Sequence, residues 1–389
     1  MLSNRTFLSS VSRSSYTSLA VTTVTLRRLK TTATARKEEK RRLQQAIRIA
    51  TMFTLTPITH PTSDTKHPLL HLQSEHGERY LFGKICEGSQ RAFTESKTRL
   101  SKLENIFLTG ELDWSSIGGL PGMILTVSDQ GKKTLGLFYG NDVLEYIIST
   151  WRYFVFRFGM ELTTNTLRDS EIYKDKLIRV KAIVVKKPVE SSEEDSLTSK
   201  LVSSLRAIVS RMFPQHEPSA RYDPSSDPYM NVELPKEIHA PKISTCYEII
   251  FNPVRGKFKL EEAIKLGVPK GPLFAKLTKG EAVQLPNGTT VQPEQVLEKQ
   301  RDFAKVLILD IPSDEYLAEF VKRFEKYDLN TLGSVYYFLG EDVTVNENLF
   351  QFMEIFDNGR AQHFVSHPSV SPNSLVFLGS ALTTLKLKA

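Results

Sequence analysis

The sequence predicts an α/β protein in which strands and helices stack in layers around a buried core. The chain has 389 residues, 40% of them apolar, which is enough for one large or two ordinary domains. After Met52, short strand-like runs separated by turn residues alternate with longer stretches in which apolar residues recur at helical spacing. This alternation is typical of layered α/β domains.

Short apolar runs bounded by turn residues predict the strands, after a first Thr-rich, sheet-like stretch at residues 53–56. Helical spacing of apolar residues, with a turn before the first of them, predicts the helices. The predicted strands are residues 69–72, 79–83, 105–109, 135–139, 177–185, 247–251, 305–309, 334–339 and 363–365, and the predicted helices are 140–158, 195–213 and 314–326.

Two stretches interrupt this pattern. Residues 186–201 begin with Lys-Lys-Pro and continue into an acidic, Ser-rich run, which predicts the exposed, flexible start of an insertion. Residues 214–242 contain six prolines and show no period, so we expect a long loop there.

The basic charge of the chain is concentrated in residues 1–51. This segment has eleven Lys or Arg residues and two acids, and the remaining 338 residues have 40 basic and 42 acidic groups. The formal net charge of +7 therefore divides into +9 and −2. From Met1 to Lys37 there are fifteen Ser or Thr residues and no acid, which favours a mitochondrial transit peptide. A disordered basic tail that binds acidic surfaces is the alternative.

Met52 is the next methionine after Met1, and it directly precedes the first strand-like stretch. We therefore expect initiation at Met1 to give a mitochondrial form of the protein. Initiation at Met52 would give a cytosolic or nuclear form.

Residue counts and motifs disfavour several classes of protein and site. The longest apolar runs are far shorter than the roughly 20 residues of a membrane-spanning helix. Two cysteines, Cys86 and Cys246, cannot build a disulfide framework or a cysteine zinc cluster. No HxH, HExxH, GxSxG, Walker A or GxGxxG motif occurs, so no active site is visible from motifs alone. The histidines at positions 60, 67, 71, 76, 216, 239, 363 and 367 are interpreted as surface or core residues.

The segment from Phe107 to Gly122 reads FLTGELDWSSIGGLPG. A strand that ends in a turn and leaves through Gly-Gly-Leu-Pro-Gly resembles the metallo-β-lactamase-fold loop that usually reads HxHxDH, and in particular the loop of tRNase Z, the endonuclease family that trims tRNA 3′ ends. By this resemblance the ligand positions are occupied by Gly110, Leu112, Trp114 and Ser115. Apart from a weak hydroxyl on Ser115, none can ligate zinc, so the resemblance implies a degenerate metal loop. A chance match in an unrelated α/β domain is the alternative for this loop alone.

Other segments extend the resemblance to nearly all of the chain after Met52. Residues 80–91 are similar to the family's LLDCGEG segment, with Lys84 in place of its aspartate. Residues 306–310 and 364–367 resemble later strand motifs, which leaves Asp310 and His367 as isolated remnants of a ligand set. The pattern resembles the N-terminal half of the long, yeast-type tRNase Z, in which two such halves share one chain and only the C-terminal half binds zinc. It implies an αββα sandwich over residues 52–389.

The segment at residues 267–281, GVPKGPLFAKLTKGE, closely resembles the Gly-Pro motif of the tRNase Z flexible arm, the exosite that holds the tRNA elbow. The resemblance implies an extruded arm, which we place with the insertion at about residues 186–300. Between Arg255 and Gly280 there are seven basic residues and two acids, a net of +5 in an otherwise slightly acidic chain.

The composition of this arm suits binding by shape. Lysines contact phosphates without reading base edges, and glycines and prolines let the backbone approach the sugar-phosphate chain closely. An amphipathic helix at residues 260–266, with Lys259 and Lys265 on its solvated face, is the alternative for those two lysines. The predicted tRNA-binding residues are Arg255, Lys257, Lys265, Lys270, Gly271, Pro272, Lys276 and Lys279.

The resemblance implies a non-catalytic half that clamps precursor tRNA and packs against a zinc-bearing tRNase Z half, in the same chain or as a separate subunit. We expect no cofactor and no catalytic residue in this chain, with zinc in the missing half. No HxHxDH loop precedes Ala389, so we expect an N-terminal fragment, a truncated gene model or a split subunit. A stand-alone nucleic-acid-binding or scaffold protein with a catalytically dead fold is the alternative, and an active metallo-hydrolase with unusual ligands is a weaker one.

Overall fold

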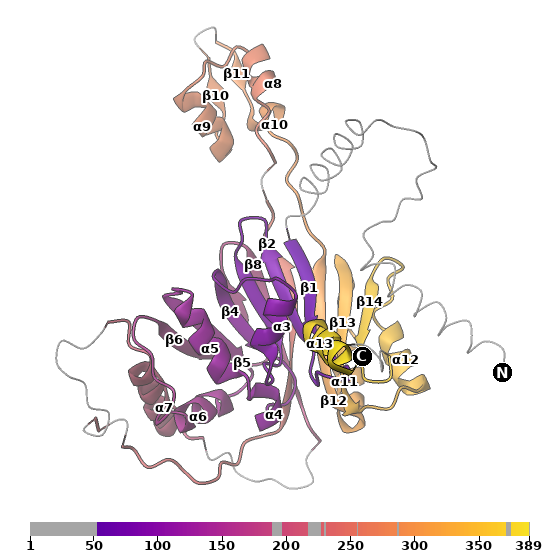
Figure 1. The fold of residues 1–389 in the computed structure, drawn as a ribbon. Coiled ribbons are helices and arrows are strands. Elements are labelled where there is room, and N and C mark those ends of the chain that lie inside the picture. Colours follow the sequence, from indigo (N-terminus) through magenta and orange to yellow (C-terminus); the bar gives the residue numbers. More distant parts are fainter. Residues whose placement is uncertain are drawn as a thin grey trace.

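The structure is a computed structural model that describes residues 53–188, 197–216, 227–228, 231–254, 256–285, 288–370 and 375–388. Two β-sheets face each other, helices cover their outer surfaces, and a small module stands clear of the sandwich (Figure 1). The predicted leader at residues 1–51 and Arg255 of the predicted arm lie outside the described residues.

The first sheet contains six strands in chain order. Its first three strands are antiparallel neighbours and the strands from β3 to β6 run parallel. The helices that follow these strands pack on its outer face. The strands are β1 (Phe53–Thr59), β2 (Leu69–Ser74), β3 (Arg79–Gly83), β4 (Leu103–Leu108), β5 (Thr134–Tyr139) and β6 (Glu161–Thr166), and the helices are α3 (Ser89–Glu95), α4 (Trp114–Ile117), α5 (Leu120–Asp129), α6 (Val143–Thr150) and α7 (Ser199–Met212).

The second sheet has the order β14-β13-β12-β9-β8-β7. Its β12, β13 and β14 are parallel, and β9 pairs antiparallel with both β8 and β12. Helices α11 and α12 cover its outer face. The elements are β7 (Ile172–Lys174), β8 (Ile178–Lys186), β9 (Ile243–Phe251), β12 (Lys305–Ser313), α11 (Asp314–Phe324), β13 (Leu332–Asp342), α12 (Glu347–Glu354) and β14 (Gln362–Ser366). The C-terminal α13 (Leu378–Lys388) lies beside α3 of the first half of the chain, where the Gly379 N–H donates to Glu95.

The core between the sheets is largely aromatic. Successive strand side chains point to opposite faces, so Phe82 and Phe107 face the second sheet whereas Leu81 and Ile106 face the helices. The rings of Phe82 and Phe107 stack with their centroids 4.8 Å apart. Such a pair contributes about 0.5–1.5 kcal/mol beyond the burial of its area. With helices outside both sheets, the described residues form the four-layered αββα sandwich that the sequence predicts.

The arm is a separate small module between β9 and β12. It contains α8 (Leu260–Lys265), α9 (Pro272–Lys279), β10 (Val283–Gln284), β11 (Thr290–Val291) and α10 (Pro293–Val296) around a core of seven buried residues. Two isolated bridges, Val254 with Arg301 and Phe258 with Leu297, form the stalk that joins it to the sandwich. Figure 1 shows the module projecting beyond the ends of the sheets.

Strands are present at each of the nine predicted ranges, and α7 and α11 confirm two predicted helices. The predicted helix at residues 140–158 is too long, since α6 ends at Thr150. After Trp151 the chain turns, and the backbone N–H of Arg157 donates to the carbonyl of Met212 on α7. The segment after α6 is therefore attached to α7 and does not continue the helix. Every helix within the described ranges is too short or too polar to cross a bilayer.

The predicted arm boundaries at about 186–300 also need correction. Residues 199–212 form α7, whose Leu205, Ile208 and Val209 pack in the core outside the first sheet. Residues 243–251 form β9, a central strand of the second sheet. The arm therefore begins after Phe251 and ends before Lys305, because the intervening helix and strand are apolar enough to join the sandwich.

Candidate nucleic-acid interface and degenerate metal cleft

The loop that follows β4 borders a cleft between the two sheets. Gly110 has a left-handed backbone with a φ of 69°. Its N–H donates to the carbonyl of Thr245 over 2.9 Å, and Thr245 returns a hydrogen bond of 3.2 Å. A Cβ at this position would lie 2.4 Å from Oδ1 of Asp310. No side chain, and hence no histidine ligand, fits at position 110 without displacing Asp310.

The rest of the loop is used to begin helix α4. The Asp113 carboxylate accepts a hydrogen bond from the Ser116 N–H, and the Ser116 hydroxyl accepts one from the Asp113 N–H, which is a capping box. Trp114 is 63% exposed, and the partly buried Leu112 packs against the outer core of the first sheet. Three of the four degenerate positions, Gly110, Leu112 and Trp114, therefore present no donor to the cleft.

Asp310 of β12 is held at the floor of the cleft. It is 1% exposed, and its two carboxylate oxygens accept hydrogen bonds from Lys84 Nζ over 3.3 Å and Thr109 Oγ1 over 2.7 Å. Burial raises the pKa of the Asp310 carboxyl above its ordinary value, and Lys84 and Thr109 oppose that rise. By the resemblance to the tRNase Z motif, Lys84 stands at the position of an aspartate, and its ammonium faces the Asp310 carboxylate.

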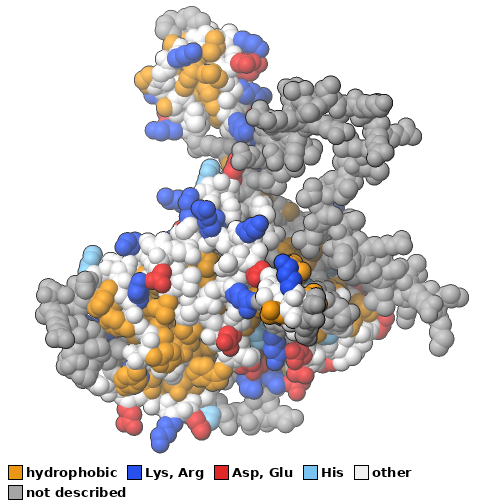
Figure 2. All heavy atoms as spheres, viewed as in Figure 1, with side chains coloured by type: hydrophobic (Ala, Val, Ile, Leu, Met, Phe, Trp, Pro, Cys, Tyr) orange, Lys and Arg blue, Asp and Glu red, His pale blue; other side chains and the backbone are white. Residues whose placement is uncertain are grey.

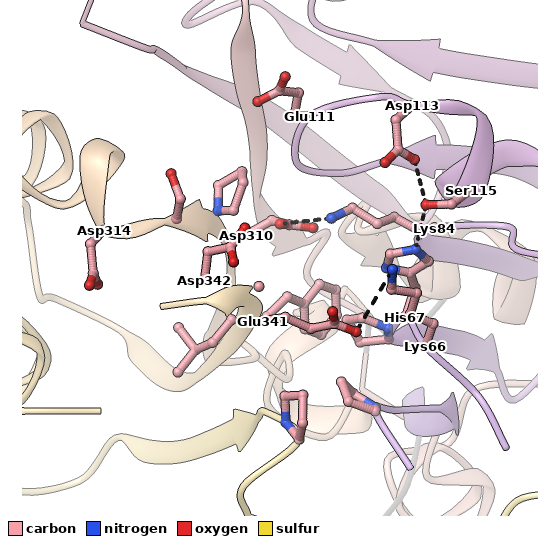
Figure 3. A pocket seen from close by; sticks show the side chains of 18 of the residues that line it. Lys66, His67, Lys84, Glu111, Asp113, Ser115, Asp310, Asp314, Glu341 and Asp342 are labelled. Carbon is pink, nitrogen blue, oxygen red and sulfur yellow. Dashed lines mark hydrogen bonds and ion pairs between the residues drawn. The ribbon is translucent and has the colours of Figure 1, made fainter. Parts of the chain in front are cut away.

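The cleft has a volume of about 560 Å³, and half of the residues that line it are charged (Figure 3). Its acids outnumber its lysines by seven to three. A polyanion such as RNA therefore meets net negative charge here. The acids are Glu111, Asp113, Asp310, Asp314, Glu315, Glu341 and Asp342, and the lysines are Lys66, Lys84 and Lys187.

The donors in this cleft do not fit the zinc site of the fold family. A protein zinc site needs three or four nitrogen, sulfur or carboxylate ligands around one point. Among the described residues, no group of three or more His, Cys, Asp or Glu side chains could hold a metal ion. His363 Nδ1 instead bonds Tyr337 over 2.9 Å, and His367 Nδ1 bonds Ser369 over 2.7 Å.

A His-Ser-Asp contact in the cleft was not predicted from the sequence, where these residues are separated by up to 48 positions. Ser115 Oγ donates to Asp113 Oδ1 over 2.8 Å and lies 3.1 Å from His67 Nε2 (Figure 3). A hydrolytic triad needs the serine to donate to histidine and the histidine to aspartate. Here serine donates to aspartate, so the order is wrong. Burial and the charge of Lys84 lower the pKa of His67 to about 4.

The arm presents lysines of two kinds. Lys265 forms an ion pair with Glu262 over 3.0 Å, one helical turn away on α8. Lys270, Lys276 and Lys279 are exposed, and within the described part of the chain they form no ion pair. Lys276 and Lys279 lie in the last turn of α9, where a cation also interacts favourably with the helix dipole. The predicted amphipathic helix is present as α8, which accounts for Lys265 better than for the other three.

The Gly-Pro motif forms the turn before α9. Gly271 has a φ of 145°, and no atom lies within 4 Å of where its Cβ would be. Pro272 is the first residue of α9, where its fixed φ suits the helix and no N–H is lost. The turn is thus open and exposed, with Lys270 beside it. Lys257, the remaining described residue of the predicted set, is exposed on the first stalk segment.

An exposed apolar area lies on the helical side of the first sheet. Figure 2 shows hydrophobic side chains gathered over helices α5, α6 and α7. Large apolar side chains exposed on α4 and just after α6 are Trp114, Tyr153 (71% exposed) and Phe154 (70%). A contiguous apolar surface can mark a site of contact with another macromolecule.

Comparisons with known proteins agree with this geometry. Residues 56–119, which include β3, β4 and the degenerate loop, match the family model described as tRNase Z endonuclease. The chain is 63% identical to Ribonuclease Z of Saccharomyces cerevisiae over 341 residues, which is 87% of this chain and 41% of that protein. It is 27% identical to the mitochondrial Ribonuclease Z of Drosophila melanogaster, over 75% of this chain and 32% of that protein.

One solved structure supports the same relationship. A long form RNase Z from yeast superposes with a TM-score of 0.70 and 53% identity over 87% of this chain and 40% of that chain. The chain spans about a third to two-fifths of the length of these relatives. The shared sequence and the structural match together place the chain in the long-form ribonuclease Z family, with the metallo-β-lactamase fold.

Proposed function

We propose that this chain is the non-catalytic, tRNA-binding half of a zinc endoribonuclease that removes 3′ trailers from precursor tRNA. The observation that carries the proposal is the arm, whose unpaired lysines project from a sandwich that lacks a metal-ligand set in its described residues. Family membership supports a role in tRNA processing.

The arm would bind tRNA through the phosphate backbone. Lys270, Lys276 and Lys279 lie within one short segment, without competing carboxylate partners in the described residues. Each such contact releases counterions and is insensitive to base identity, as required of a protein that accepts every tRNA. Lys257, which is exposed on the stalk, would extend the same surface toward the sandwich.

Cleavage needs a catalytic half as partner. We place the docking surface for this partner on the exposed apolar side chains of α4 and of the segment just after α6. We expect zinc in that catalytic half and none in this chain. The partner would supply metal-activated water for phosphodiester hydrolysis. The aromatic residues Trp114, Tyr153 and Phe154 are of the type that dominates the energetics of such interfaces.

The leader bears on localisation. Its Ser/Thr-rich, acid-free composition favours import into mitochondria, and the Drosophila relative is named as mitochondrial. Fluorescent fusions that start at Met1 and at Met52 test the two-form hypothesis. Distinct locations would support it, and identical locations would contradict it.

Reconstitution tests the proposed function. The full chain is mixed with a separately produced catalytic half, and 3′ trailer removal from a precursor tRNA is measured. We expect cleavage to rise at least about tenfold over the catalytic half alone, because the arm adds substrate affinity. Binding of tRNA without any change in cleavage would instead support the stand-alone binding or scaffold function. Trp114→Asp should abolish the gain while leaving tRNA binding by this chain intact.

A further inference from the structure

The pair of Lys84 and Asp310 joins the two sheets at the cleft. Lys84 follows β3 of the first sheet, and Asp310 belongs to β12 of the second. Both are largely removed from water, with exposures of 7% and 1%, and their charged atoms are 3.3 Å apart. The two residues are 226 positions apart in the chain, so only the tertiary fold brings them together.

Residues of both sheets form hydrogen bonds with the side chain and the backbone of Asp310. Thr109, the residue after β4, donates to Oδ2, and the Ser244 hydroxyl of β9 donates to the Asp310 backbone carbonyl. The Asp310 N–H points to Cys246 Sγ over 3.2 Å. Gly110 leaves the space that the carboxylate occupies. The backbone bridge between Gly110 and Thr245 runs beside this cluster and also links the first sheet to β9.

We infer that Lys84 has turned the former metal cleft into a metal-independent joint, in which its ammonium supplies the positive charge that holds Asp310 and fixes β9 and β12 onto the first sheet. β9 and β12 are the two strands that continue into the stalk of the arm. The joint therefore fixes the two strands from which the arm extends, near the strand ends that are farther from the arm. This role is independent of whether the chain binds tRNA.

The physics of buried ion pairs gives the proposal a distinctive signature. Removing one partner leaves an uncompensated buried charge and is strongly destabilising, whereas replacing both partners by apolar groups often costs little. A pair that contributes nothing would give small effects in both single variants. A metal site would instead gain stability when zinc is added.

The test is a double-mutant cycle in the full chain, measured by thermal denaturation. We expect Lys84→Met and Asp310→Leu each to lower Tm by about 5–10 °C. The double variant should lose less Tm than the sum of the two single losses. The control is the exposed pair of Lys322 and Glu319, whose charged atoms are 2.6 Å apart, where Lys322→Met should change Tm by less than about 2 °C.

Zinc and a chelator complete the experiment. Neither should change the Tm of the unsubstituted chain. Additive losses of Tm in the two single variants, or a rise in Tm with stoichiometric zinc, would contradict the proposed joint. If Lys84→Met fails to fold, Lys84→Arg and Asp310→Asn enter the cycle, and Lys84→Arg is expected to keep most of the stability.

Discussion

The arm and the cleft differ most clearly in what their charges face. In the arm, Lys270, Lys276 and Lys279 point to solvent without carboxylate partners in the described residues. In the cleft, Lys84 is buried against Asp310, and acids outnumber lysines around the cavity. The same residue type is therefore available to a ligand in one region and used to hold the fold together in the other. Burial and pairing, rather than the number of lysines, decide which region can bind RNA.

The largest expected effect comes from the arm lysines. We expect Lys270→Gln, Lys276→Gln and Lys279→Gln together to weaken tRNA binding by at least about tenfold at 0.1 M salt, because three phosphate contacts are lost. The slope of log K against log salt should fall in magnitude by about 2 to 3. Filter binding over a salt series measures both quantities.

The matched control replaces three exposed lysines of the sandwich, Lys174, Lys322 and Lys326, by Gln. This variant removes the same charge from the chain and should leave the slope of log K against log salt nearly unchanged. Equal effects of the two triple variants would mean that net charge, not the arm, determines binding.

A histidine at position 110, where the tRNase Z loop has a zinc ligand by resemblance, should destabilise the cleft and not create a zinc site. Gly110→His forces a side chain against the Asp310 carboxylate at a left-handed φ. We expect the free energy of unfolding to fall by about 2–4 kcal/mol. Urea denaturation measures the loss, and elemental analysis should find no stoichiometric zinc. A stable, zinc-loaded variant would contradict our description of the cleft.

Acid should destabilise the sandwich through His71. This residue of β2 is 3% exposed, and burial, with the charge of Arg79, lowers its pKa from 6.5 to about 4. The folded state therefore keeps His71 neutral while the unfolded chain binds a proton. The free energy of unfolding should fall as pH drops from 6.5 to 4, by at most about 1.4 kcal/mol per pH unit. His71→Leu should flatten this part of the stability profile, and an unchanged profile would exclude His71 as the cause.

The smallest effect is expected from the acids of the cleft. Glu341→Gln with Asp342→Asn lowers the negative charge on the rim of the cavity. If tRNA does not enter the cleft, affinity should rise by less than about twofold, through weak long-range attraction alone. A large gain would show that RNA approaches the cleft closely.

The sequence predicted the layers well because strands and helices were marked by local patterns. The alternation that sends Phe82 inward and Leu81 outward is visible in the residues themselves. The end of α6 could not be predicted, since the chain after it turns and bonds to α7, which is distant in the sequence. The length of the arm was overestimated for a similar reason, because β9 joins a sheet only through distant partners.

In the candidate sites, too, local features could be predicted from the sequence and contacts between distant residues could not. The resemblance to tRNase Z located the degenerate loop and the arm, and the charge count singled out the lysines. The pairing of Lys84 with Asp310, 226 positions apart, could not be predicted from local sequence patterns. The resemblance indicated only that a lysine stands at the position of an aspartate in the tRNase Z motif. The ion pair that separates Lys265 from the other arm lysines is visible only in three dimensions.

Crosslinking tests most directly the central claim that tRNA binds to the arm and not to the cleft. Precursor tRNA that carries 4-thiouridine is irradiated with the full chain, and the crosslinked peptides are identified by mass spectrometry. Peptides from residues 256–285 should dominate, and the Lys270, Lys276 and Lys279 triple variant should lose them. Crosslinks concentrated at Ser115, Glu341 and Asp342 would contradict the claim.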